Sequence, residues 1–256
     1  MTASPPITLA LVGIGTGNPE HLTLQAIRVL NSVDLILIPR KGTAKADLAE
    51  LRREICARVV TNPAVRIAEF DLPLRDAAHE DYRAGVDDWH DAIAAIWAER
   101  IAAELGSSGR VALLVWGDPS LYDSTLRIAG RVALSLPLAV EVVPGITSLQ
   151  ALTAAHAIPL NEIGAPVVVT TGRRLRDEGW PISAQSVAVM LDGECSFQAL
   201  EPAGLSIWWG AYVGMAEELT LAGPLEEMAA QIIETRRAAR ARHGWIMDIY
   251  ILRRSA

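Results

Sequence analysis

Three loops rich in glycine, proline and small polar residues are the parts of the sequence best suited to chemistry. Each follows an apolar run directly, and the loops are residues 13–20, 117–122 and 144–148. If the apolar runs form a parallel sheet, all three loops lie at its carboxyl edge, where open α/β sheets bind their ligands. Asp118 directly follows Gly117 in the second loop, and a carboxylate there could accept hydrogen bonds from hydroxyl groups of a ligand.

The first loop carries three alternating glycines in residues 13–17 and leads into a helical pattern, so backbone N–H groups are exposed where a ligand can approach. A dinucleotide site needs a third glycine at the position that Asn18 holds, and an acidic residue at the end of the second strand. That strand ends in Pro39-Arg40, and no Gly-Lys-Ser/Thr sequence follows the loop. These differences disfavour a nicotinamide-dependent oxidoreductase and a P-loop site, and a tight turn without a ligand stays an open alternative.

Apolar runs alternate with helical patterns through the first 160 residues. The runs 34–39 and 111–116 are typical of strands buried on both faces, whereas 65–70 alternates like a strand nearer an edge. Apolar spacing predicts helices at residues 22–30, 48–59, 86–101 and 124–135. The fold class is therefore α/β, and we expect an N-terminal domain over residues 1–160 with a mostly parallel sheet.

Residues 158–166 hold two prolines and a glycine and are the best candidate for a linker. Four strand-like runs follow at residues 167–171, 186–191, 205–209 and 246–252, with a helix before the last one. We expect a smaller C-terminal α/β domain with a mixed sheet over residues 161–256. The arginines near the end of its last helix are expected to form a solvated face; they are Arg236, Arg237, Arg240 and Arg242.

The composition excludes several classes of protein. Of the 256 residues 51% are hydrophobic and 21% charged, which suits a folded chain with a sizeable core. The net charge of −7 disfavours a nucleic-acid partner, and no apolar run approaches the ~20 residues of a membrane span. The start of the chain lacks the basic region of a signal peptide, so we expect a cytoplasmic protein. Cys56, Cys195 and the scattered histidines lack the spacing of a metal site, and no metal is expected.

Three ordered motifs, at residues 12–23, 113–122 and 142–148, resemble those of the tetrapyrrole (corrin and porphyrin) methyltransferases. These are class III S-adenosylmethionine enzymes, and the resemblance runs from Ile7 to about Leu252. It implies two α/β domains with an active-site cleft between them, a homodimer, S-adenosylmethionine as cofactor and S-adenosylhomocysteine as product. The family's first motif reads G-x-G-P-G, and this chain has Thr16 in place of the proline.

The resemblance also assigns residues to the cofactor and to the ring. The implied cofactor contacts are Gly117, Asp118, Leu121, Thr147, Ser148, Met190, Ala211 and Tyr212. The first glycine loop, with Gly15 and Thr16, is implied to help hold the tetrapyrrole.

Four further stretches, at residues 70–76, 82–90, 170–174 and 207–212, are similar to a branch of the family that acts in aerobic cobalamin synthesis. This similarity implies methylation of carbon-1 of precorrin-5 with release of acetate, giving precorrin-6A. A family member acting on another ring carbon is one alternative. A corrinoid or cofactor carrier without catalytic activity is another.

The implied reaction has two chemical requirements. Methyl transfer depends mainly on alignment of the donor and the ring carbon, whereas deacylation needs a base to activate water. The candidate catalytic residues are Asp118, Tyr82 and His90. The substrate carries many carboxylates, which guanidinium groups can bind in a bidentate manner, and the candidates for this role are Arg40, Arg173 and Arg174, with Lys41 and Arg176 beside them.

Overall fold

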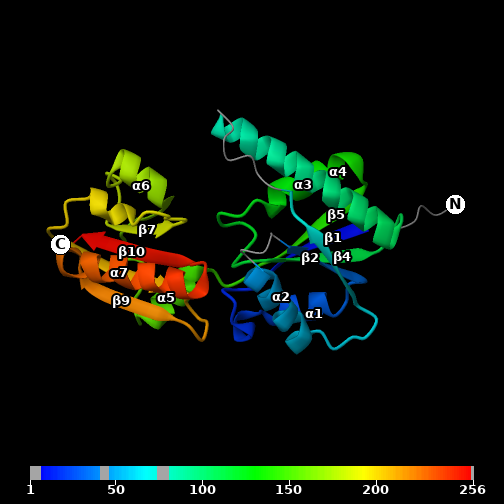
Figure 1. The fold of residues 1–256 in the computed structure, drawn as a ribbon, viewed down its shortest axis with the longest axis horizontal. Coiled ribbons are helices and arrows are strands. Elements are labelled where there is room, and N and C mark those ends of the chain that lie inside the picture. The colour runs from blue at the N-terminus through cyan, green and yellow to red at the C-terminus, as the bar shows by residue number, and fades with distance from the viewer. Residues whose placement is uncertain (1–6, 41–45, 74–80, 255–256) are drawn as a thin grey trace. The chain divides into compact units, whose positions relative to one another are not determined.

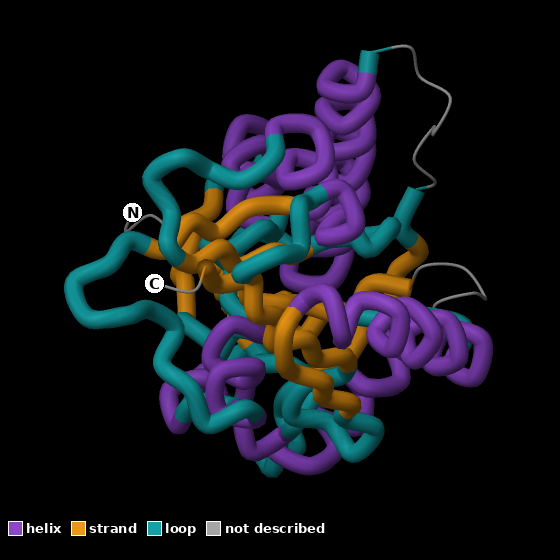
Figure 2. Tube along the Cα trace, turned by 90° about the vertical axis from the view of Figure 1, so that its left-hand side faces the viewer, coloured by secondary structure: helices purple, strands orange, loops and turns teal. Residues whose placement is uncertain are grey.

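The computed structural model describes residues 7–40, 46–73 and 81–254 (Figures 1 and 2). It forms two compact units that divide between Ile146 and Thr147, whereas the sequence places the boundary after residue 160. The difference is α5 (Ser148–Ala155), which packs on the second unit. His156, at the C-cap of α5, contacts the carbonyl oxygen of Trp209 through its Nε2 atom at 3.0 Å.

The first unit contains the expected parallel sheet. Its strands run in the order β3-β2-β4-β1-β5 and every pair is parallel. They are β1 (Ile7–Gly13), β2 (Leu35–Arg40), β3 (Arg66–Asp71), β4 (Arg110–Val115) and β5 (Leu138–Val143). The prediction that residues 65–70 form a strand near an edge is confirmed, because β3 is the outermost strand on its side.

Helices cover both faces of this sheet, as Figure 1 shows. Leu9 and Leu11 belong to the core under α3 (Tyr82–Leu105) and α4 (Thr125–Ser135). Ala10 and Val12, which alternate with them, belong to the core under α1 (Leu24–Leu30) and α2 (Ala46–Val59). A short 3₁₀ turn, η1 (Pro19–His21), precedes α1. The neighbouring strands β1 and β4 are thus followed by helices on opposite faces, which makes their carboxyl ends the topological switch point of the sheet.

The second unit contains the expected mixed sheet, in the order β6-β7-β10-β8-β9. Its strands are β6 (Val167–Thr171), β7 (Ser186–Met190), β8 (Leu205–Ala211), β9 (Leu219–Pro224) and β10 (Asp248–Arg254). Strands β6 and β7 are parallel, and the other pairs are antiparallel. Strand β9 is absent from the sequence-based prediction, because Gly223 and Pro224 resemble a turn. An edge strand tolerates both residues.

The helices of the second unit, besides α5, are α6 (Gly172–Glu178), the 3₁₀ turn η3 (Ser196–Ala199) and α7 (Leu225–His243). The expectation of a solvated arginine face on α7 is wrong for Arg236, which is buried and forms a 2.8 Å ion pair with Asp248. Among the helices that the structure describes, none has the length and apolar character needed to cross a membrane.

Candidate active site

The loops after β1 and β4 are joined by backbone hydrogen bonds at the topological switch point of the first sheet. The N–H of Gly117 donates to the carbonyl of Gly15 at 2.7 Å, and the N–H of Gly15 donates back to Gly117 at 3.4 Å. One residue earlier, the N–H of Ile14 donates to Val115 at 2.9 Å. These backbone groups are therefore used within the protein and do not form a phosphate-binding cradle.

The loop after β5 packs against the same two loops so closely that side chains are excluded. A Cβ atom on Gly145 would lie 2.1 Å from the carbonyl oxygen of Gly117, and one on Gly13 would lie 2.6 Å from the nitrogen of Gly145. Such distances are far below any van der Waals contact. The glycines of all three motifs thus allow three loop backbones to meet, which is the arrangement that the parallel-sheet argument predicts.

Asp118 holds two of these loops together. Its Oδ2 atom accepts a 2.9 Å hydrogen bond from the N–H of Gly145, and its Oδ1 atom accepts from the N–H of Ser120 at 2.8 Å and from the Ser120 hydroxyl. Burial raises the pKa of Asp118, but the hydrogen bonds from Ser120 and Gly145 together outweigh it and hold the pKa below its ordinary value. Both carboxylate oxygens are engaged by the protein, so the side chain is better suited to fixing the loops than to accepting a proton.

The other predicted cofactor residues of this loop lie beside Asp118. Gly117 adopts φ 63°, and the N–H of Leu121 closes a turn onto the carbonyl of Asp118 at 3.2 Å. Tyr122 adopts φ 50° and is 43% exposed, an uncommon backbone conformation for a non-glycine residue. The turn leaves the half-buried side chain of Leu121 next to fixed backbone polar groups.

Thr147 and Ser148 begin α5. Thr147 is the N-cap: its side-chain oxygen accepts from the N–H of Leu149 at 3.2 Å, and Gln150 completes a capping box by accepting from the N–H of Thr147 at 3.0 Å. Ser148 is the first helical residue and is half-buried. The threonine hydroxyl is thus used to start the helix.

Met190, Ala211 and Tyr212 come together at one edge of the second sheet. Met190 ends β7 and Ala211 ends β8, and the start of β10 lies between these two strand ends. The residues just beyond the strands, Leu191 and Tyr212, adopt φ 53° and 52°. Non-glycine residues held in this region are often found at functional sites.

Tyr212 is fixed from several directions. Its hydroxyl donates to the carbonyl of Trp245 at 2.6 Å, its N–H donates to Met247 at 2.9 Å, and its ring lies edge-on to that of Trp245. Burial raises the pKa of the phenol above its ordinary value. Tyr212 can therefore offer a ligand its rigid backbone rather than a mobile hydroxyl group.

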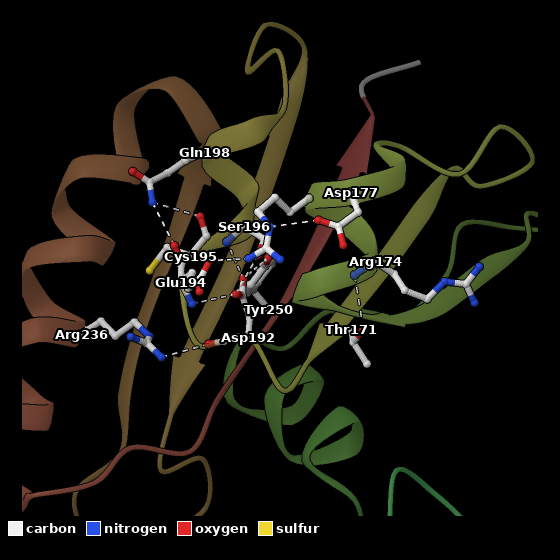
Figure 3. A network of polar contacts seen from close by, with 11 residues as sticks. Thr171, Arg174, Asp177, Asp192, Glu194, Cys195, Ser196, Gln198, Arg236 and Tyr250 are labelled. Atoms are coloured by element: carbon white, nitrogen blue, oxygen red, sulfur yellow. Dashed lines mark hydrogen bonds and ion pairs between the residues drawn. The ribbon is translucent and has the colours of Figure 1, made fainter. Parts of the chain in front are cut away.

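A buried polar network, not predicted from the sequence, lies next to the end of β7 (Figure 3). Asp192 accepts hydrogen bonds from the hydroxyl of Tyr250 at 2.7 Å and from the N–H and hydroxyl of Ser196 at 2.6 and 2.9 Å. Arg236 donates to the carbonyl of Asp192 at 2.9 Å while it pairs with Asp248. Asp192 follows a buried strand closely, as Asp118 does, and that shared position is the signal that could have identified it.

Two of the arginines proposed for substrate carboxylates are paired with carboxylates of the chain itself. Arg40 bonds to Asp71 at 2.9 Å, and Arg174 bonds to Glu178 at 2.8 Å. Arg173 lies exposed on α6. Arg176 is paired as well, with Asp177 at 3.1 Å and with Glu194, and Lys41 lies outside the described residues.

Thr16 replaces a proline of the family motif and is fixed by a side-chain hydrogen bond. Its hydroxyl lies 2.9 Å from the Nδ1 atom of His21. A Cβ atom on the preceding Gly15 would lie 2.6 Å from the Cβ atom of the same histidine. Proline restrains a loop through its ring, and here a hydrogen bond across η1 restrains it instead.

The two remaining catalytic candidates lie on α3. His90 is only 4% exposed, and neither ring nitrogen has a hydrogen-bond partner in the part of the chain that the structure describes. Burial, followed by the nearby Arg131, lowers the pKa of its imidazole. Tyr82 is the first residue of α3, and its side chain lies outside what the structure describes.

The chain matches the family described as Tetrapyrrole (Corrin/Porphyrin) Methylases over residues 8–229. It is 52% identical over 250 residues to the precorrin-6A synthase (deacetylating) of Sinorhizobium sp., which covers 97% of this chain and 95% of that protein. It is 30% identical over 184 residues to the precorrin-2 C(20)-methyltransferase of Sinorhizobium sp., covering 65% of this chain and 69% of the relative.

Two solved structures show the same architecture. CobF of Corynebacterium diphtheriae, described as related to cobalamin synthesis, superposes with a TM-score of 0.83 at 38% identity, covering 98% of this chain and 99% of that one. The uroporphyrin-III C-methyltransferase of Thermus thermophilus, solved with S-adenosylhomocysteine, gives 0.59 at 20% identity over 96% of each chain, a likeness of the fold alone. With a family match over most of its length and a relative more than half identical to it, the chain belongs to the tetrapyrrole (corrin/porphyrin) methylase family.

Proposed function

We propose that the chain catalyses the precorrin-6A synthase reaction: it methylates carbon-1 of precorrin-5 and releases the extruded two-carbon unit as acetate. The observation that carries this proposal is the 52% identity to a precorrin-6A synthase over nearly the whole of both chains. The loops after β1, β4 and β5 support it, because they meet at the carboxyl edge of an open parallel sheet, where such sheets bind ligands.

The proposed methyl donor is S-adenosylmethionine, which supplies an electrophilic methyl group when it is bound. Apolar side chains beside fixed backbone polar groups suit its adenosine and amino-acid parts, and both units offer this combination, at Leu121 and at Met190. The proposed contacts are Gly117, Asp118 and Leu121 in the first unit and Thr147, Ser148, Met190, Ala211 and Tyr212 in the second. The hydrogen bonds that hold these loops would keep donor and ring carbon aligned, an effect worth several kcal/mol.

We assign Asp118 a positioning role in this scheme, because its oxygens are already bonded to Gly145 and Ser120. For the deacylation, Tyr82 and His90 are the proposed sources of general-base help. Burial lowers the pKa of His90 and so favours the neutral imidazole, the form that can accept a proton from water. The proposed ring contacts are Arg40, Arg173 and Arg174. A substrate carboxylate would take the place of Asp71 at Arg40 and of Glu178 at Arg174. We also propose that the chain forms the homodimer typical of the family.

A comparison of two tetrapyrrole substrates tests the proposed function. The chain is incubated with S-adenosylmethionine and either precorrin-5 or uroporphyrinogen III, and the products are identified by mass spectrometry. We expect turnover with precorrin-5 alone and free acetate in the same reaction. Methylation of uroporphyrinogen III would favour a family member that acts earlier on the ring, and binding of precorrin-5 without methylation would favour a carrier.

A further inference from the structure

Arg52 on α2 differs from the paired arginines described above. Its Nε donates to the carbonyl of Leu114 at 3.2 Å and its Nη1 to the carbonyl of Leu48 at 3.2 Å. The guanidinium carbon lies 4.9 Å from the centre of the Trp116 ring. Within the described ranges the structure gives Arg52 no ion pair. Carbonyl oxygens and an aromatic face contact the guanidinium, and the carboxylate of Asp123 stabilises its charge from beyond ion-pair distance.

The position of Arg52 follows from the way two strands separate. Strands β2 and β4 pair up to Leu37 and Leu113, and Leu114 is the first residue of β4 beyond that pairing. Arg52 donates to this free carbonyl and covers Trp116, the residue before Gly117. The guanidinium therefore lies at the carboxyl edge of the first sheet, directly beside the loop proposed to bind the cofactor.

The chemistry of this position favours an anion. A guanidinium has five N–H donors, and the residues that the structure describes accept from two of those on Arg52. Burial lowers the pKa of Arg52 to about 10, although Asp123 and Cys56 act in the opposite direction. A desolvated guanidinium without an ion-pair partner is unfavourable. A carboxylate would match the remaining N–H donors of Arg52 in geometry as well as in charge. The Nε1 atom of Trp116 also lacks an acceptor among the described residues.

We propose that Arg52 binds a peripheral carboxylate of the tetrapyrrole and so anchors the ring beside the residue 117–122 loop. The identity of the ligand rests on the proposed function, whereas the site itself rests on the geometry of Arg52. The ligand class is a macrocycle with carboxylate side chains, and the contact is a charge-assisted, fork-like pair. The same carboxylate would accept from the N–H groups of Arg52 and Trp116 that have no acceptor among the described residues.

The test compares Arg52→Gln with Arg58→Gln, a control on the same helix whose side chain is exposed. Glutamine removes the charge but keeps an N–H that can donate to a carbonyl. The probe is uroporphyrin III, a stable tetrapyrrole with many carboxylates, and S-adenosylhomocysteine is titrated in parallel. We expect Arg52→Gln to weaken uroporphyrin binding about 10- to 100-fold with a smaller salt dependence, and Arg58→Gln to bind like the wild type. Affinity for S-adenosylhomocysteine should stay within about twofold of the wild type.

Unchanged uroporphyrin binding by a folded Arg52→Gln protein would overturn the proposal, and so would equal weakening of both ligands. If Arg52→Gln does not fold, Arg52→Lys replaces it; a lysine keeps the charge but loses the fork, so weaker binding supports the proposal and unchanged binding refutes it. Absence of wild-type turnover with precorrin-5 would contradict the proposed function and leave the uroporphyrin comparison valid.

Discussion

The carboxylate of Asp118 accepts a 2.9 Å hydrogen bond from the backbone N–H of Gly145 and so joins the loop after β4 to the loop after β5. Its other oxygen is bonded to Ser120, within its own loop. One side chain thus fixes two of the three family motifs. The aspartate of the second motif organises the site by holding backbone in place.

Replacing Asp118 by asparagine should weaken cofactor binding more than it weakens the fold. The amide accepts the N–H of Gly145 through a neutral oxygen, and hydrogen bonds to charged groups are worth about 1.5–3 kcal/mol. We expect the Kd for S-adenosylhomocysteine, measured by calorimetry, to rise at least about tenfold. Glu99→Gln, an exposed carboxylate on α3, is the control and should bind normally. Normal binding by Asp118→Asn would show that the bond to Gly145 is dispensable.

The same variant should change the response of stability to acid. The folded pKa of Asp118 lies below the ordinary value, so its contribution is present above the unfolded pKa of about 4 and is lost as the pH falls through the folded value. Urea unfolding at neutral pH and between about pH 4 and 3 measures this. We expect Asp118→Asn to lose less stability than the wild type over that interval, and parallel losses would contradict the assignment.

Gly145→Ala should be severely destabilising, because the added Cβ would lie 2.1 Å from the carbonyl of Gly117. The loops must then separate, at a cost that we expect to reach about 3 kcal/mol or more. Gly130 on α4 is the matched control, since a Cβ there has no heavy atom within 4 Å. Gly130→Ala should be neutral or stabilise by up to about 1 kcal/mol. Thermal unfolding distinguishes the two, and a wild-type melting temperature for Gly145→Ala would refute the contact.

Adjacent arginines on α7 should differ sharply in their contribution to stability. Arg236 is 9% exposed and pairs with Asp248, whose pKa burial raises despite that pairing. Arg236→Met leaves a buried carboxylate uncompensated and should cost about 3–5 kcal/mol. Arg237 pairs with Glu234 on the surface, and Arg237→Met should cost less than about 1 kcal/mol. Denaturant unfolding of both variants checks this, and similar values would mean that the buried network contributes little.

His90→Gln should separate the two chemical steps if His90 serves as the base. We expect acetate release to slow by about 10²-fold or more while the methyl group is still transferred. The measurement is the ratio of acetate released to methyl incorporated, followed over time. A histidine that serves only the packing of α3 would slow both steps together, and that outcome would remove His90 from the mechanism.

The sequence predicted the first sheet well because parallel strands buried on both faces are continuous apolar runs, and Leu9 and Ala10 indeed face opposite cores. The meeting of the three loops also followed from the parallel topology. The partner of Asp118 could not be predicted, since the bond to Gly145 depends on how closely two loop backbones approach. Arg236, which is buried, and Arg52, which has no ion pair among the described residues, resemble ordinary helix-surface arginines in sequence. Only their neighbours in space distinguish them.

The most direct test of the proposed reaction uses wild-type protein, precorrin-5 and S-adenosylmethionine carrying a ¹³C-labelled methyl group. Nuclear magnetic resonance then locates the label in the product, and acetate is quantified in the same sample. The proposed function predicts that the label resides on carbon-1 and that acetate is released in a one-to-one ratio to methyl groups incorporated. A label on another carbon, or methylation without acetate, would contradict it.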